Sequence, residues 1–100
     1  MKDATKQRSE RVSNCLKGVV HPTRLRVLRA LENGEMSVNS LVDTLDDVSQ
    51  STLSQHLSIM QSRGILVRRK EGTQVFYDVS DQKIFQFLAL VEELFCKEEK

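Results

Sequence analysis

The stretch formed by residues 48–79 changes its periodicity at Gly64, and this change constrains the fold more than any other feature. Before the glycine, apolar side chains recur at the spacing of one helix face. These apolar residues are Leu53, Leu57 and Met60. Ser49 is suited to cap such a helix, because its hydroxyl can accept a hydrogen bond from a free amide of the first turn. The pattern therefore predicts a helix over residues 49–63 that ends at a glycine in a left-handed conformation.

After Gly64, β-branched, aromatic and alternating residues replace the helical spacing. Two such runs, residues 65–70 and 75–79, flank a short turn in which Gly72 can adopt a positive φ. A helix, a glycine and a hairpin in this order are typical of a recognition helix followed by a wing. An ordinary helix packed on an ordinary hairpin is the alternative, but a mere scaffold has little reason to expose a face of amides and hydroxyls.

Opposite its apolar face, the predicted helix carries short or flat polar groups that both donate and accept hydrogen bonds. Such groups can bind base edges or phosphate oxygens, so we interpret them as contacts to double-stranded DNA. They are Gln50, Ser51, Thr52, Ser54, Gln55 and His56. In the hairpin, the expected DNA contacts are Arg68, Lys70, Thr73 and Gln74. A winged helix used for protein interaction alone should instead expose apolar groups on this face.

Three helices are predicted before the recognition helix. The first covers residues 9–20 and the second residues 22–32, and they are separated because the residue before Pro22, His21, avoids helical angles. Ser37 is suited to cap a short third helix, which is followed by a tight turn. Two short helices joined by such a turn make a helix-turn-helix.

A last helix is expected to begin after Ser80 and Asp81, which can cap it, and to end at about Lys97. Residues 1–8 are expected to form a flexible tail, and residues 9–100 one domain. The predicted fold is therefore mainly α with a small β-hairpin. It is a winged helix-turn-helix with about five helices and a two-stranded wing.

The last helix is apolar over more than half of its circumference, and the first helix also carries an apolar stripe. On the last helix the stripe comprises Ile84, Phe87, Leu88, Val91, Leu94 and Phe95; on the first it comprises Val12, Cys15, Leu16, Val19 and Val20. A chain of 100 residues cannot easily bury both stripes. We therefore expect a homodimer in which these helices pack against a second subunit, and an inverted-repeat operator. The alternative is that the core of one subunit absorbs them.

Composition excludes several other classes. The chain is 39% hydrophobic and 29% charged, as expected for a folded domain, and its net charge of +1 says little about nucleic acid. No apolar run approaches the roughly 20 residues needed to span a membrane, and the amino end does not resemble a signal peptide, so we expect a cytoplasmic protein. We find no nucleophile elbow, phosphate-binding glycine loop or metal-hydrolase spacing, and expect neither an enzyme nor a cofactor.

Several segments together resemble the ArsR/SmtB family of small bacterial repressors. They are residues 21–28 (HPTRLRVL), 49–57 (SQSTLSQHL), 64–67 (GILV), 69–72 (RKEG) and 75–77 (VFY). The resemblance covers roughly residues 12–96. It implies a winged-helix homodimer with the first and last helices at its interface. It also implies a repressor that binds an operator and is released by an inducer.

The residues that bind metal in many family members are replaced here. The family's cysteine pair, in a pattern ELCVCDL, falls on residues 36–41, which contain no thiol. In the zinc site that other members have on the last helix, Asp81 matches the first ligand, but Lys83 stands at the expected histidine. Leu94 and Lys97 occupy the places of the later pair. We therefore expect no metal site, because one carboxylate does not hold zinc.

The chain resembles most closely the thiol- and persulfide-sensing branch of the family (HlyU-, BigR- and SqrR-like). That branch pairs a cysteine near the end of the last helix, which Cys96 matches, with a cysteine on an earlier helix. Val42 occupies the place of the second thiol, so Cys15 would have to substitute for it. The resemblance thus implies a thiol switch formed by Cys15 and Cys96. Two alternatives are a site for arsenite or another soft metal, and two structural cysteines without an inducer.

Overall fold

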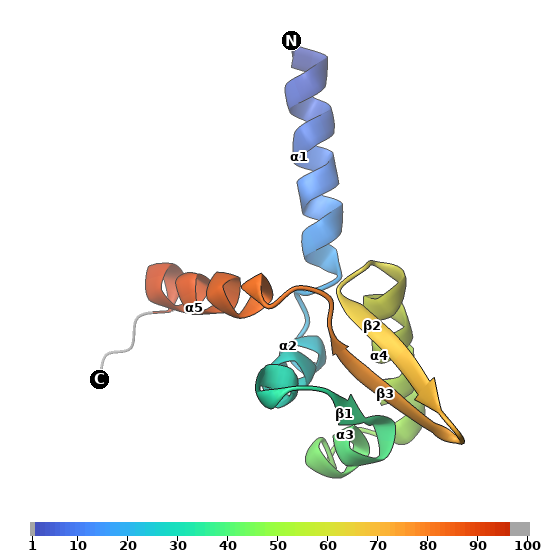
Figure 1. The fold of residues 1–100 in the computed structure, drawn as a ribbon. Coiled ribbons are helices and arrows are strands. Elements are labelled where there is room, and N and C mark those ends of the chain that lie inside the picture. The colour runs from blue at the N-terminus through green and yellow to red at the C-terminus, as the bar shows by residue number, and fades with distance from the viewer. Residues whose placement is uncertain (1, 97–100) are drawn as a thin grey trace.

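The computed structural model describes residues 2–96, which form five α-helices, one 3₁₀ turn and a three-stranded antiparallel sheet. The helices are α1 (Lys2–Lys17), α2 (Pro22–Ala30), α3 (Val38–Thr44), α4 (Gln50–Ser62) and α5 (Lys83–Phe95), and the 3₁₀ turn is η1 (Leu31–Asn33). The strands are β1 (Met36–Ser37), β2 (Leu66–Glu71) and β3 (Gln74–Val79). In Figure 1, α2, α3, α4 and the sheet form one body, from which α1 and α5 project in different directions. The predicted fold class, a winged helix-turn-helix, is confirmed.

The core lies between α2, α3, α4 and the sheet, where the predicted helical stripes meet. Its fully buried side chains are mainly leucines, and they come from every one of these helices. They are Val27, Leu28, Leu31, Leu41, Leu45, Leu53, Leu57, Met60 and Leu66. Because α4 buries one face here, its opposite face is turned to solvent.

The ends of α4 are formed as the sequence predicts. The Ser49 hydroxyl accepts a hydrogen bond from the backbone N–H of Thr52 at 3.1 Å, and Gly64 has a φ of +79°. The hairpin closes at Gly72, whose φ is +64°, with Glu71 opposite Gln74. Three residues, 63–65, with the glycine in the middle, therefore connect α4 to the first strand of the wing.

The sheet has one strand more than the sequence predicts. Strand β1 pairs with β3, placing Met36 opposite Tyr77 and Ser37 opposite Phe76. Two residues are too short for a periodic pattern, so only the tertiary pairing defines this strand. Ser37 also caps α3, because its hydroxyl accepts from the backbone N–H of Ser40 at 3.1 Å.

The prediction for the amino-terminal segment was wrong in two respects. Helix α1 begins at Lys2, so residues 2–8, expected as a tail, are helical; Met1 lies outside the described residues. These residues contain neither glycine nor proline and are mostly good helix formers, which allows the helix to extend without tertiary contacts. The helix also ends at Lys17 rather than at Val20.

The residue that follows α1, Gly18, is closely packed. The glycine is buried at the junction of α4 and β2, and a Cβ built on it would lie 2.6 Å from Cδ of Arg63 and 2.7 Å from Cδ1 of Ile65. The guanidinium of Arg63 donates to the carbonyl of Asn14 at 2.8 Å, and that of Arg24 donates to the carbonyl of Lys17 at 3.0 Å. Two of the last carbonyls of α1, those of Asn14 and Lys17, are therefore satisfied by arginine side chains from outside the helix.

Helix α5 begins at Lys83, where Asp81 accepts from the backbone N–H at 2.9 Å as predicted, whereas Ser80 donates instead to the carbonyl of Ile65. It ends at Phe95, and the predicted end at Lys97 lies outside the described residues. Within α5, Leu88 alone is buried. None of the helices in residues 2–96 combines the length and apolar character needed to cross a bilayer.

Candidate nucleic-acid interface

The outward face of α4 consists of the polar side chains that the sequence singles out. Gln50, Ser51, Thr52, Ser54 and Gln55 are all exposed. Their side chains make no hydrogen bond to other residues in the part of the chain that the structure describes. They are therefore free to bind an external partner, and their amides and hydroxyls can both donate and accept.

The wing separates its basic residues between the two faces of the sheet. Leu66, Arg68 and Lys70 alternate with Val67 and Arg69 along β2, so Arg68 and Lys70 share the face that packs toward α4. Neither forms an ion pair within residues 2–96. Their positive charges thus remain available beside the recognition helix.

Arg69, on the other face, is neutralised. Its guanidinium forms two hydrogen bonds of 2.8 Å with Glu35, a third with Glu71, and lies 4.5 Å from the ring centroid of Phe76. The hydrogen bonds that Arg69 donates to Glu35 and Glu71 raise the pKa of Arg69, and the bonds that Glu35 accepts lower the pKa of its carboxyl group.

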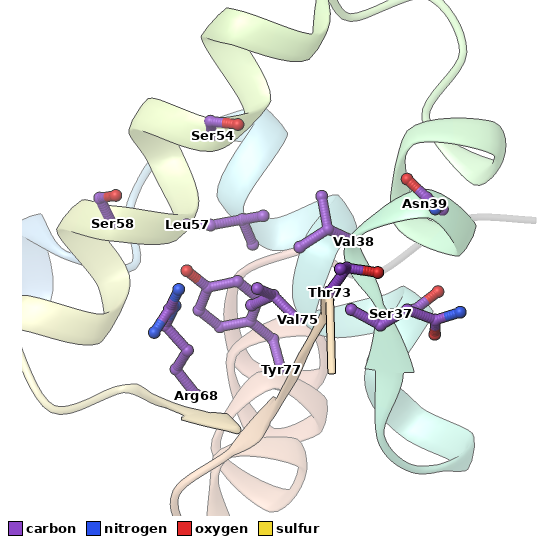
Figure 2. A pocket seen from close by; sticks show the side chains of 11 residues that line it. Ser37, Val38, Asn39, Ser54, Leu57, Ser58, Arg68, Thr73, Val75 and Tyr77 are labelled. Atoms are coloured by element: carbon purple, nitrogen blue, oxygen red, sulfur yellow. The ribbon is translucent and has the colours of Figure 1, made fainter. Parts of the chain in front are cut away.

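Four of the predicted DNA contacts line one groove of about 390 Å³ between α4 and the wing, which we call the α4–wing groove. They are Ser54, Arg68, Thr73 and Gln74. Figure 2 shows three further polar residues there that the sequence analysis missed: Asn39 from α3, Ser58 from α4 and Tyr77 from β3. Ser58 lies one turn after Ser54, so helical spacing could have identified it. No sequence signal connects Asn39 or Tyr77 to this place.

His56 was predicted to contact DNA, but the structure places it against α2. It is half-buried, its Nδ1 accepts a hydrogen bond from Nε of Arg24 at 3.0 Å, and its ring centroid lies 4.4 Å from that of His21. Burial lowers the pKa of His56, and the charges of His21 and Arg24 lower it further. The neutral ring carries its proton on Nε2, since Nδ1 is an acceptor.

The turn before α4 is held by a further charged pair. Arg26 forms hydrogen bonds of 3.0 and 2.7 Å to the two carboxylate oxygens of Asp47. The hydrogen bond from Arg26 lowers the pKa of Asp47. A bidentate pair restrains direction as well as distance, and it connects α2 to the entry of α4.

The two cysteines lie on the projecting helices. Cys15 belongs to α1 and Cys96 caps the end of α5; both thiols are exposed and free. Cys96 borders a second groove of about 540 Å³, mostly apolar, which Leu16 of α1 and Phe87 of α5 also line. In the described part of the chain, no three His, Cys, Asp or Glu side chains gather as a metal site requires.

Comparison with known proteins agrees with this architecture. Residues 19–69 match the model of a helix-turn-helix domain family. An uncharacterized HTH-type transcriptional regulator of Methanocaldococcus jannaschii is 39% identical over 88% of this chain and 99% of its own length. The biofilm growth-associated repressor of Xylella fastidiosa is 35% identical over 94% of this chain and 82% of its own length. The chain belongs to the ArsR family of winged-helix regulators.

Solved structures extend the similarity of this ArsR-family protein to the whole fold. Reduced HlyU from Vibrio cholerae superimposes with a TM-score of 0.74 and 33% identity, over 97% of this chain and all of that one. The homodimeric winged helix-turn-helix domain of Mb0332 from Mycobacterium bovis, described as a possible ArsR-family regulator, has a TM-score of 0.75 and 25% identity. This superposition covers 98% of this chain and 94% of that domain. The protein is thus a DNA-binding transcriptional regulator.

The environment of His56 generates a prediction for stability. Because its pKa is depressed in the folded state, the unfolded chain binds a proton here more readily once the pH falls below about 6.5. The contribution of neutral His56 is therefore fully present above this pH and is lost as the pH falls through the folded pKa. Urea unfolding of the wild type and of His56→Gln, between about pH 5 and 8, measures this effect.

The difference in unfolding free energy between the two proteins should be constant above about pH 7 and should narrow below about pH 6.5. A difference that stayed constant down to about pH 5 would show that the Arg24–His56 contact does not depend on a neutral imidazole.

Proposed function

We propose that this ArsR-family regulator is a homodimeric repressor that binds an inverted-repeat operator and leaves it when Cys15 and Cys96 are oxidised or persulfidated. The observation that carries the DNA-binding part is the coincidence of two features on one surface. The exposed amides and hydroxyls of α4 lie beside Arg68 and Lys70, which have no acidic partner within the described residues. Polar groups that match base edges and free cations that match phosphates are the two requirements of operator binding.

The two sets of residues have different roles in this proposal. The side chains of α4, from Gln50 to Gln55, enter the major groove and distinguish base pairs. Arg68, Lys70, Thr73 and Gln74 contact the sugar–phosphate backbone or the minor groove. His56, through its free Nε2, is restricted to a phosphate at the edge of the contact.

Dimerisation is supported by apolar surface that one subunit leaves uncovered. Val20 on the segment after α1, and Leu90, Leu94 and Phe95 on α5, are between 51% and 78% exposed. Such a surface is typical of a protein–protein interface. The relative from Mycobacterium bovis is described as homodimeric. Two-fold symmetry of the protein then requires two-fold symmetry of the operator.

The thiol switch is supported by the exposure of both sulfurs and by their place on these same helices. In the proposed reaction, two thiols become a disulfide while a persulfide loses its sulfane sulfur as hydrogen sulfide, which takes up the two electrons and two protons. The bridge forms within or between subunits. It changes the spacing of the two recognition helices and weakens the fit to both half-sites.

The division of roles predicts that two substitutions differ in how their effect depends on the DNA sequence. Gln55→Ala should weaken binding to the selected operator by about 1–3 kcal/mol and to random DNA far less, because it removes a base contact. Lys70→Ala should weaken all sequences alike and reduce the salt slope by about one, because it removes a phosphate contact. Fluorescence anisotropy at several salt concentrations measures both. If Lys70→Ala changed preference and Gln55→Ala did not, the roles would be reversed.

The exposed surface of α5 predicts the oligomeric state. The wild type should be a dimer at micromolar concentration in light scattering, and Leu90→Glu should be a monomer, because a carboxylate would be buried at the interface. Val67→Glu is the matched control: Val67 and Leu90 are each 51% exposed, but Val67 lies on the outer face of the wing. A wild-type monomer, or equal dissociation of both variants, would contradict the proposed interface.

The thiol switch predicts a dependence on both sulfurs. Persulfide should release the wild type from its operator and leave Cys15→Ser and Cys96→Ser bound, because neither variant can close a bridge. Reduced samples of all three proteins serve as controls. Release by arsenite instead would identify a soft-metal site, and a wild type that neither agent releases would identify the cysteines as structural. Release of the single variants by persulfide would exclude the paired switch.

A further inference from the structure

The α4–wing groove brings hydrogen-bond donors from four elements together. Ser54 and Ser58 come from α4, Arg68 from β2, Tyr77 from β3 and Asn39 from α3 (Figure 2). We infer that this groove binds one phosphate group of the DNA backbone, with the Arg68 guanidinium and the Tyr77 hydroxyl as its principal donors. The inference rests on the proposed function, because it names the part of the operator that this site holds.

Tyr77 is the first reason. The residue is 6% exposed and belongs to the hydrophobic core, yet its hydroxyl makes no hydrogen bond to any residue in the described range. Figure 2 shows this hydroxyl pointing toward α4 within the groove. None of the buried side-chain polar atoms in the described residues lacks a hydrogen-bond partner, so the ring of Tyr77 is buried while its unbonded hydroxyl reaches the solvent of the groove. This hydroxyl is therefore free to donate to an acceptor from outside the chain.

The charge of the groove is the second reason. Of its eleven lining residues none carries a carboxylate, and Arg68 is the charged residue among them. Arg68 stands directly opposite Tyr77 in the register of β2 and β3, so both side chains emerge on the same face. Arg69, one residue later, lies on the other face of the sheet and forms ion pairs with Glu35 and Glu71. A guanidinium without a carboxylate, beside neutral O–H donors, is the chemistry that recognises a phosphate.

The position of the groove distinguishes a backbone phosphate from other anions. When a recognition helix lies in the major groove and the wing beside it approaches the minor groove, one sugar–phosphate strand passes between them. The α4–wing groove occupies this place. A phosphate held there would fix the register of α4 against the base pairs, as phosphate contacts do in general.

The test compares Tyr77→Phe, which keeps the buried ring and removes the hydroxyl, with Arg68→Gln. Tyr77→Phe should weaken operator binding about tenfold, the effect of one hydrogen bond to a charged group. Arg68→Gln should weaken it further and reduce the salt slope by about one. Arg11→Gln on the exposed face of α1 makes the same change of charge far from the groove and should leave binding unchanged.

Operators with one phosphate replaced by an uncharged methylphosphonate identify the contact. At one position in each half-site, the replacement should weaken operator binding by the wild type. It should not weaken binding by Tyr77→Phe or Arg68→Gln any further, because the contact is already missing in these variants. Thermal unfolding checks that each variant is folded. If Tyr77→Phe is not, Arg68→Gln on the exposed wing carries the comparison.

The outcomes separate this inference from the proposed function. A wild type that selects an operator, together with variants that bind it equally well, would overturn the phosphate site and leave the repressor. The phosphate site would also be overturned if the variants bound the operator more weakly but no single methylphosphonate replacement had a smaller effect on them than on the wild type. A third experiment titrates the protein with inorganic phosphate, with chloride at equal ionic strength as the control, and measures whether the groove binds a free anion. Saturable binding lost in both variants without any change in DNA affinity would assign the groove to a free anion. A wild type that selects no DNA would remove the proposed function itself.

Discussion

Burial of one face of α4 is the contact on which the DNA-facing surface depends. Leu53, Leu57 and Met60 are each no more than 1% exposed, and they pack against α2 and the sheet. Truncating a side chain of this kind to alanine costs about 2–5 kcal/mol, so a rotation of α4 that exposed all three would unfold the domain. The helix therefore has one orientation, and Ser51 and Gln55 point outward as a geometric consequence.

Ion pairs decide where positive charge remains, even though the net charge of the chain is only +1. Among the described residues, the pairs join Arg26 to Asp47, Arg29 to Glu32 and Glu92, and Arg69 to Glu35 and Glu71. Exposed pairs of this kind add little to stability. Their effect is on the distribution of charge: Arg26, Arg29 and Arg69 are neutralised, while Arg68 and Lys70 beside α4 are not. A nearly neutral protein can in this way present a locally basic surface.

Two arginines connect the projecting helix α1 to α2 and to the recognition helix α4. Arg63 follows α4 and donates to the carbonyl of Asn14, and Arg24 of α2 donates both to the carbonyl of Lys17 and to His56 of α4. Gly18 permits the close approach of these segments. A displacement of α1 would thus act directly on the middle of α4, through His56, and on its carboxyl end, through Arg63. An inducer that acts on α1 or α5 needs such a connection to α4 in order to change DNA binding.

The sequence by itself determined the helix-turn-helix, the caps at Ser49 and Gly64, and the polar face of α4, because each depends on periodicity or on a local hydrogen bond. It did not determine the two-residue strand β1 or the start of α1, since the first exists only through pairing with β3 and the second through helix propensity without an apolar pattern. The tertiary structure alone decided that His56 turns toward Arg24, that Arg69 is neutralised while Arg68 is not, and that Tyr77 opens into a groove with Ser58 and Asn39. These relations join residues that are distant in sequence, and only the packing of α2, α3, α4 and the sheet brings them within reach.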